Sequence, residues 1–266
     1  MMRITNRMIT EHAITHMSES LEQLHSLQEK NSTQKKFANA SDDPLAASLS
    51  LSLKSTLNTI GDYGKTVDLA KDWMSANEIA FQKAEELSTS ATTLISRALN
   101  DTFGAGERAN AFAEDLNGII REAVDAVNTS HNGQYIFAGI QVGQPGPPYS
   151  IPNNTTPVPT LNAAINGTVQ RTIGPGKSIT LNFHADDAFG AFFQTLVDAR
   201  DALLNNDTNA LRTSLTALQS NLNLLDQNRT LNGARMRQAE VAQDYLEKTR
   251  IETESLISQN EDINLA

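Results

Sequence analysis

The sequence predicts a mainly α-helical protein: an elongated bundle of long coiled-coil-like helices from both chain ends, with a small β-rich domain inserted between them. Apolar residues recur every seven positions between residues 46 and 84, and a similar pattern returns between residues 211 and 246. Between these stretches the composition changes, because seven of the chain's eight prolines fall between Pro145 and Pro175. We therefore expect two long helices to pack on each other, with the proline-rich segment as an insertion.

The first heptad pattern predicts a helix from residue 44 to about residue 99. A serine and two aspartates stand directly before Pro44, and such N-cap residues followed by proline are typical of a helix start. Polar Thr56 and Asn77 fall within the apolar seam, as Gln243 does in the returning helix, and these would tune the helix register. The residues at the seven-residue interval are Ala46, Leu53, Ile60, Val67, Met74 and Phe81, with Leu49, Tyr63, Ala70 and Ala84 at half-steps.

The remaining elements follow from shorter patterns. We expect helices over residues 8–30 and 107–130, joined to their neighbours by loops with polar residues or glycines. Alternating residues predict small strands over 165–173 and 178–183, and a turn leading into a short strand over 131–139. Asp187 is expected to cap a short helix to about residue 206, and Asp207 the long helix that continues past residue 257.

These patterns divide the chain into five predicted segments. The N-terminal axial helical segment covers residues 1–40 and the first part of a helical rod domain covers 41–139. The inserted small β-rich outer domain covers 140–187. The returning part of the rod covers 188–250, and residues 251–266 begin a C-terminal axial helical segment.

Composition excludes several classes of function. The chain has 31 acidic against 21 basic residues and a net charge of −10, which argues against binding to nucleic acid. It contains no cysteine, so disulfides, thiolate catalysis and cysteine-ligated metals are excluded. The N-terminus lacks the apolar core of a signal peptide, and no stretch is long enough to span a bilayer. We therefore expect no membrane insertion and no export by the general signal-peptide route.

Possible catalytic and metal-binding patterns all have a simpler interpretation. His12 and His16 lie four residues apart on a predicted helix, but no third ligand follows, so a solvated helix face is favoured. Asp42 and Asp43 stand directly before a proline, which favours helix capping over cation binding. We predict no catalytic residue, no metal site, no cofactor and no enzymatic activity.

Three motifs point to a known family. The sequence SDDPLAAS at residues 41–48 resembles the flagellin superfamily of bacteria. The sequence NGQYIFAG at 132–139 is similar to a motif of the hook-associated protein type 3 branch, whose members join hook to filament. The sequence RTLNGAR at 229–235 resembles the glycine-centred motif on the family's returning helix. The resemblance covers the chain in the right order, except for the insertion.

The resemblance implies a structural role in the flagellum. Such a subunit would travel unfolded through the flagellar export channel, with an export chaperone as partner, and would be located outside the cell. Its terminal helices would fold against neighbouring subunits, where burial of the apolar seam offsets the entropy of ordering. The expected partners are copies of itself in a ring, together with neighbouring hook-associated and filament subunits.

Three groups of residues are the predicted sites. We assign Asp42, Asp43 and Pro44 to the joint between the terminal and rod domains. A stripe of exposed apolar residues on the first helix is predicted to contact other subunits, and three residues are predicted to anchor the insertion to the rod. The stripe consists of Ile14, Met17, Leu21 and Leu24, and the anchor consists of Tyr135, Ile136 and Phe137.

The sequence departs from the family at its end, where relatives continue past Ala266 with a further amphipathic helix that pairs with the N-terminal one. We therefore expect the segment from Ile14 to Leu24 to be loose in the isolated chain. Two alternatives stay open: a filament flagellin, or a non-flagellar coiled-coil interaction module. The second alternative predicts a stable helical oligomer that forms no ring or fibre.

Overall fold

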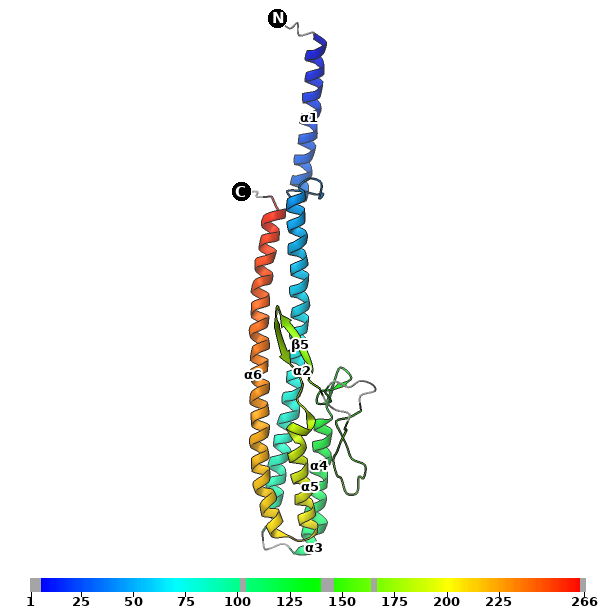
Figure 1. Cartoon of the computed structure of the whole chain (residues 1–266), viewed down its shortest axis with the longest axis vertical. Helices are drawn as coiled ribbons and strands as arrows, with labels where there is room; N and C mark the ends of the chain where they lie inside the picture. The colour runs from blue at the N-terminus through cyan, green and yellow to red at the C-terminus, as the bar shows by residue number, and fades with distance from the viewer. Residues whose placement is uncertain (1–5, 101–103, 140–145, 164–166, 264–266) are drawn as a thin grey trace. The chain divides into compact units, whose positions relative to one another are not determined.

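In a computed structural model of the chain, the structure describes residues 6–100, 104–139, 146–163 and 167–263 (Figure 1). The chain packs into two compact units, the first of residues 1–62 and 244–266 and the second of residues 63–243. The two longest helices, α2 (Pro44–Ala98) and α6 (Thr208–Glu261), contribute residues to both units. This division falls inside the segments that the sequence predicts as the rod, and each unit is described by itself below.

The first unit contains α1 (Asn6–Thr33), the beginning of α2 and the end of α6. The chain leaves α1 through Gln34, whose φ of 57° is the left-handed conformation that commonly ends a helix. It then pairs with the residues that follow α6, through an antiparallel bridge between Lys35 and Asp262. The first unit is thus tied together by backbone pairing between segments from opposite ends of the chain.

The second unit is a helical core with small strand pairs beside it. Its helices are parts of α2 and α6, the short α3 (Ala105–Glu107), α4 (Ala113–Val127) and α5 (Ala191–Leu204). Five-residue π-helical turns, η1 (Arg108–Phe112) and η2 (Asp186–Gly190), lead directly into α4 and α5. Figure 1 shows α4 and α5 beside the adjoining stretches of α2 and α6.

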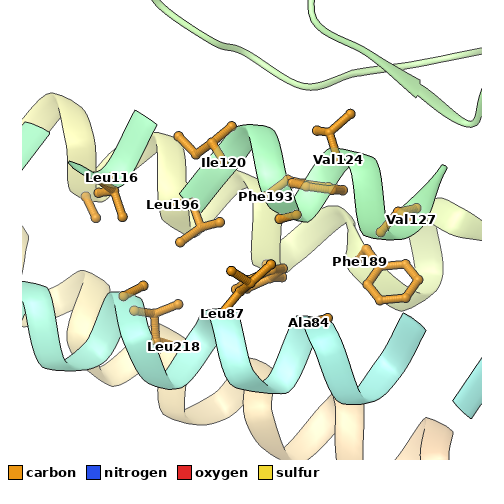
Figure 2. Packing of buried hydrophobic residues seen from close by; sticks show 14 of the residues in the cluster. Ala84, Leu87, Leu116, Ile120, Val124, Val127, Phe189, Phe193, Leu196 and Leu218 are labelled. Atoms are coloured by element: carbon orange, nitrogen blue, oxygen red, sulfur yellow. The ribbon is translucent and has the colours of Figure 1, made fainter. Parts of the chain in front are cut away.

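Apolar side chains from all four of these helices form one buried core (Figure 2). Phe81 of α2 lies at the centre of an aromatic cluster, with ring centroids 5.0 Å from Phe183 and 5.3 Å from Phe189. Aromatic pairs at such separations stabilise a core beyond the burial of their area. Further members of this core are Leu87, Leu116, Ile120, Phe193, Leu196 and Leu218.

The strands form three separate two-stranded antiparallel ladders. These are β1 (Ser130–His131) with β2 (Gln134–Tyr135), β3 (Tyr149–Ser150) with β4 (Thr160–Leu161), and β5 (Gln170–Gly174) with β6 (Lys177–Thr180). Asn132 and Gly133 connect β1 to β2 with φ values of 51° and 76°. A two-residue connection with positive φ at both positions is a type I′ turn, for which Asn-Gly is the preferred sequence.

The predicted fold class is confirmed: the chain is mainly α-helical with a small β region. Helix α2 ends one residue before the expected position, and burial confirms the heptad seam from Ile60 to Phe81. At the start of α2 the seam prediction was wrong for Leu49 and Thr56, which are exposed, whereas Ala46 and Leu53 are half-buried. Asn77 is buried as expected.

Other expectations need correction. Asp187 caps no helix, because it lies inside η2, whose N-cap is Ala185 without a side-chain bond. The helix predicted over 107–130 starts in α3, is interrupted by the π-helical turn η1 and ends at Val127. The strands predicted over 165–173 and 178–183 are shorter than expected, and residues 165 and 166 lie outside the described residues.

Candidate assembly surface and joints

Helix α1 carries an apolar stripe that no described part of the chain covers. Each described side chain of this helix is exposed, including the apolar ones. The stripe residues Ile14, Met17, Leu21 and Leu24 have exposed fractions of 64%, 64%, 65% and 54%. An isolated helix of this polar composition is marginally stable in water, and a row of exposed aliphatic side chains marks a contact surface. The geometry is that of a helix lacking its packing partner; the role in subunit contact remains a prediction.

The predicted joint residues build the turn that starts α2. Asp43 Oδ1 accepts the backbone N–H of Ala46 at 3.0 Å, which makes Asp43 the N-cap, and Pro44 is the first residue of the helix. Asp42 turns the other way, since its Oδ2 accepts the N–H groups of Asn39 at 2.9 Å and Ala38 at 3.1 Å. The hydrogen bond from Asn39 and, to a smaller extent, that from Ala38 lower the pKa of Asp42.

A buried carboxylate at the end of α6 completes this region, and the sequence analysis missed it. Glu261 receives the ammonium groups of Lys35, at 2.5 Å, and of Lys54, while only 6% of its side chain is exposed. Its backbone carbonyl accepts the N–H of Lys36 at 2.6 Å, and Gln34 accepts the N–H of Ile263 at 3.0 Å. The hydrogen bonds from Lys35 and then Lys54 lower the pKa of Glu261 to about 2.

This cluster explains why the chain pairs where it does. An ionised carboxylate that leaves water needs compensating charge and hydrogen bonds, and the two lysines supply both. Next to it, Asn260 Nδ2 donates to Ala46 O at 2.8 Å and to Ser50 Oγ at 2.7 Å. The end of α6 is therefore bonded to the linker after α1 and to the first turns of α2. One glutamate in an acidic chain gave no sequence signal of this role.

The predicted anchor residues divide between the core and the surface. Ile136 and Phe137 are fully buried, whereas Tyr135 is half-buried and pairs with Ser130 in the β1–β2 ladder. The Phe137 ring lies 5.6 Å from Phe81 and 4.9 Å from Phe189, both in edge-to-face geometry. Phe137 thus joins the residues after α4 to the common aromatic cluster. Whether the three residues anchor the insertion remains a prediction.

A buried amide pair holds the chain where it returns from the insertion. Asn77 of α2 donates from Nδ2 to Leu181 O at 2.9 Å and to Asn232 Oδ1 of α6 at 3.3 Å. Asn232 Nδ2 in turn donates to Met74 O at 2.9 Å. Both amides are buried, so losing either would leave polar groups without partners. The sequence located Asn77 in the seam but could not show that Asn232 is its partner.

Two arginines extend this set of contacts along α6. Arg229 forms ion pairs with Glu78, at 2.5 Å, and with Glu85, both on α2. Arg235 Nη1 donates to Asn182 O at 3.2 Å, and its guanidinium lies 4.5 Å from the centroid of the Phe183 ring. The motif at 229–235 places Arg229, Asn232 and Arg235 three residues apart, on one side of the helix. This side of α6 therefore contacts both α2 and the returning segment.

The described residues contain no group of three or more His, Asp or Glu side chains placed to hold a metal ion. Within the same residues, no helix combines the length and the apolar character needed to cross a membrane. The described residues instead form a helical core, a capped turn at the start of α2 and an exposed apolar stripe on α1.

These features define a class of mainly helical proteins whose N-terminal helix carries an exposed apolar stripe. The family model for the bacterial flagellin N-terminal helical region matches residues 4–142, which is more than half of the chain. The chain therefore belongs to this flagellin family, and the predicted resemblance is confirmed.

Curated relatives point to one branch of the family. The chain is 32% identical over 139 residues to Flagellar hook-associated protein 3 of Salmonella typhimurium, and 29% identical over 139 residues to the Escherichia coli protein of that name. Each match covers 52% of this chain and 44% of the relative, so the matched region spans less than half of each relative.

Solved structures support the fold over a larger part of the chain. FlgL of Bacillus cereus is 21% identical, with a TM-score of 0.66, over 78% of this chain and 99% of that one. A putative flagellar hook-associated protein of Vibrio parahaemolyticus is 14% identical, with a TM-score of 0.74, over 83% and 100%. The flagellar junction protein FlgL of Legionella pneumophila is 13% identical, with a TM-score of 0.62, over 82% and 100%.

Proposed function

We propose that the chain is a structural subunit of the bacterial flagellum that joins hook to filament. In this role it is exported unfolded through the flagellar channel and assembles outside the cell through its terminal helices. Its partners are copies of itself in a ring, adjoining hook-associated and filament subunits, and an export chaperone before assembly. The proposal includes no catalysis, because the joint is mechanical.

The uncovered stripe of α1 is the observation that carries this proposal. A subunit that is stable alone would be expected to bury such a row of apolar side chains, whereas a subunit of a larger assembly keeps it for its neighbours. The entropy lost when a loosely held helix docks is offset by burial of the stripe at the moment of assembly. The names of the curated relatives favour a junction subunit over a filament flagellin.

Complementation in bacteria tests the proposal. A strain lacking its own hook–filament junction subunit would receive the full-length gene product containing this chain. Attached filaments would be counted by electron microscopy, and export would be measured separately in the culture medium. We expect filament attachment to be restored. Export without any attached filament would overturn the junction role, and filaments built from this protein alone would indicate a flagellin.

A stripe variant shows whether α1 is responsible. The triple substitution Met17→Gln, Leu21→Gln, Leu24→Gln removes three of the four stripe residues while keeping good helix formers. We expect normal export and no attached filaments. Wild-type assembly by this variant would exclude the stripe as the contact surface.

A matched control changes the opposite side of the same helix. The triple substitution Glu19→Gln, Gln23→Ser, Ser26→Gln alters three exposed polar positions. We expect this variant to assemble like the wild type, because no apolar side chain is lost.

A further inference from the structure

A polar pocket lies in the second unit, where the chain returns from β6 to η2 beside α6. Its volume is about 370 Å³. Among the residues that line it are Asn182, Phe183, His184 and Asp187 from the returning segment, with Asn228 and Arg235 from α6. The pocket has no part in the proposed assembly through α1, because these residues all belong to the other compact unit.

Arg235 is the strongest feature of this pocket. Its guanidinium is held in place by the Phe183 ring at 4.5 Å and by a single hydrogen bond to Asn182 O at 3.2 Å. Among the described residues, no carboxylate oxygen lies within salt-bridge distance of it. Burial lowers the pKa of Arg235, with no nearby anion to offset the loss of water. A guanidinium carries five N–H donors, so most of them have no acceptor among the described residues.

The other walls of the pocket add further polar groups. Nδ2 of Asn228 is buried and has no hydrogen-bond acceptor in the described part of the chain. The half-buried ring of His184 adds two nitrogen atoms, and no described residue bonds to them. Asp187 is the acidic residue among the lining residues, and it is exposed. The pocket therefore contains a fixed cation and an orphaned amide, and the carboxylate in its lining, that of Asp187, belongs to an exposed residue outside salt-bridge distance of Arg235.

We propose that this pocket binds one oxyanion group, a carboxylate or a phosphate, held by the guanidinium fork of Arg235 with Asn228 at its side. A planar guanidinium matches two oxygens of such a group, and stacking on Phe183 orders the fork in advance. The anion comes either from a small free molecule or from an acidic side chain of a second copy, since the chain carries 31 acidic residues.

Titration followed by NMR tests the proposal. The side-chain signals of Arg235 Nε–H and the Asn228 amide would be recorded while sodium phosphate or acetate replaces chloride at constant ionic strength. We expect saturable shifts with half-saturation on the order of millimolar. A shift that grows linearly without saturation would overturn the proposal.

Two arginine variants separate a specific site from general charge effects. Arg235→Gln is expected to weaken binding about tenfold or more, because the fork is lost. Arg237→Gln removes an identical charge from an exposed position two residues further along α6 and is expected to leave the titration unchanged. Equal weakening in both variants would overturn the proposal. Arg235→Lys, which keeps the charge without the fork, should also bind weakly and serves if Arg235→Gln does not fold.

The source of the anion is resolved by diluting the protein without added phosphate or acetate. If the same signals shift with protein concentration and phosphate reverses that shift, the carboxylate belongs to a second copy. If they are independent of concentration while phosphate still saturates the site, the ligand is a free anion. Signals that respond to neither protein nor added anion would overturn the proposal.

Discussion

Helices α1 and α4 carry similar apolar patterns but differ in how far the apolar side chains are buried. In α4, residues at three- and four-residue spacing are buried in the core, whereas residues at the same spacing in α1 are exposed. The buried set in α4 includes Leu116, Ile120, Ala123 and Val127. Spacing thus shows that a helix face needs a partner, but it does not show whether the partner lies in the same chain.

The largest effect is expected in the aromatic cluster of the second unit. Phe137→Ala removes a fully buried ring that packs on Phe81 and Phe189. We expect a loss of about 3–5 kcal/mol in the free energy of unfolding. Urea unfolding followed by fluorescence of the single tryptophan, Trp73, measures it. Tyr135→Phe, at a half-buried neighbour, should cost much less, and equal losses would show that the cluster is not the source.

A smaller loss is expected for the buried amide pair. Asn232→Ala removes the donor to the carbonyl of Met74 and the acceptor for one hydrogen bond from Asn77 Nδ2. The expected cost is about 1–3 kcal/mol. Hydrogen exchange at residues 181–183 should rise with it, because the returning segment loses a fixed neighbour. Unchanged exchange there would show that the pair holds only the two helices.

The charged cluster of the first unit gives a pH-dependent effect. The pKa of Glu261 is about 2 when folded, against an ordinary value of 4.5, so its contribution is complete above about pH 4.5 and is lost as pH falls toward 2. Glu261→Gln should remove this dependence at a cost of about 1 kcal/mol, since Lys35 and Lys54 are half-exposed. Acid titration followed by amide exchange at residues 34–36 checks it.

A contrary result for this cluster is easily recognised. If the variant and the wild type open at the same pH, another carboxylate controls the first unit. Glu240→Gln, which removes an exposed carboxylate in the other unit, is the matched control for the lost negative charge.

The smallest effect is expected for α1. Leu21→Ala should change the free energy of unfolding by less than about 0.5 kcal/mol, because the side chain is 65% exposed and no core contact is lost. Calorimetry of the isolated chain measures it. A cost like that of a core residue would mean that α1 has a partner within the chain, and the contrast with α4 would fail.

Local patterns predicted much of this fold. The capping residues before Pro44 and the heptad pattern together predicted the limits of α2 to within a residue. Asp207 caps α6 as expected, accepting the N–H groups of Asn209 and Ala210 at 3.0 Å. These features depend on neighbours in sequence, so one chain is enough to find them. The exposure of Leu49 could not be predicted, because spacing alone does not show where along a helix its partner begins.

The candidate sites were harder to predict for the same reason. The capping role of Asp43 is local and was anticipated. The contacts of Glu261 with Lys35 and Lys54 join residues more than 200 positions apart, as does the bond from Asn260 to Ala46. A lone glutamate or asparagine resembles any solvated polar residue until the fold brings its partners to it.

The π-helical turn before α4 affects how this chain should be aligned with its relatives. A helix rotates by about 100° per residue, and a π turn accommodates one extra residue. The helical residues before the turn are therefore rotated by about 100° relative to those after it. Deleting one residue within 108–112 would allow a continuous regular α-helix. Residues 105–107 would then rotate about the helix axis, while α4 would keep its packing. A relative that is one residue shorter within this turn would therefore keep the packing of α4, and only a comparison that allows a gap there would align it correctly with this chain.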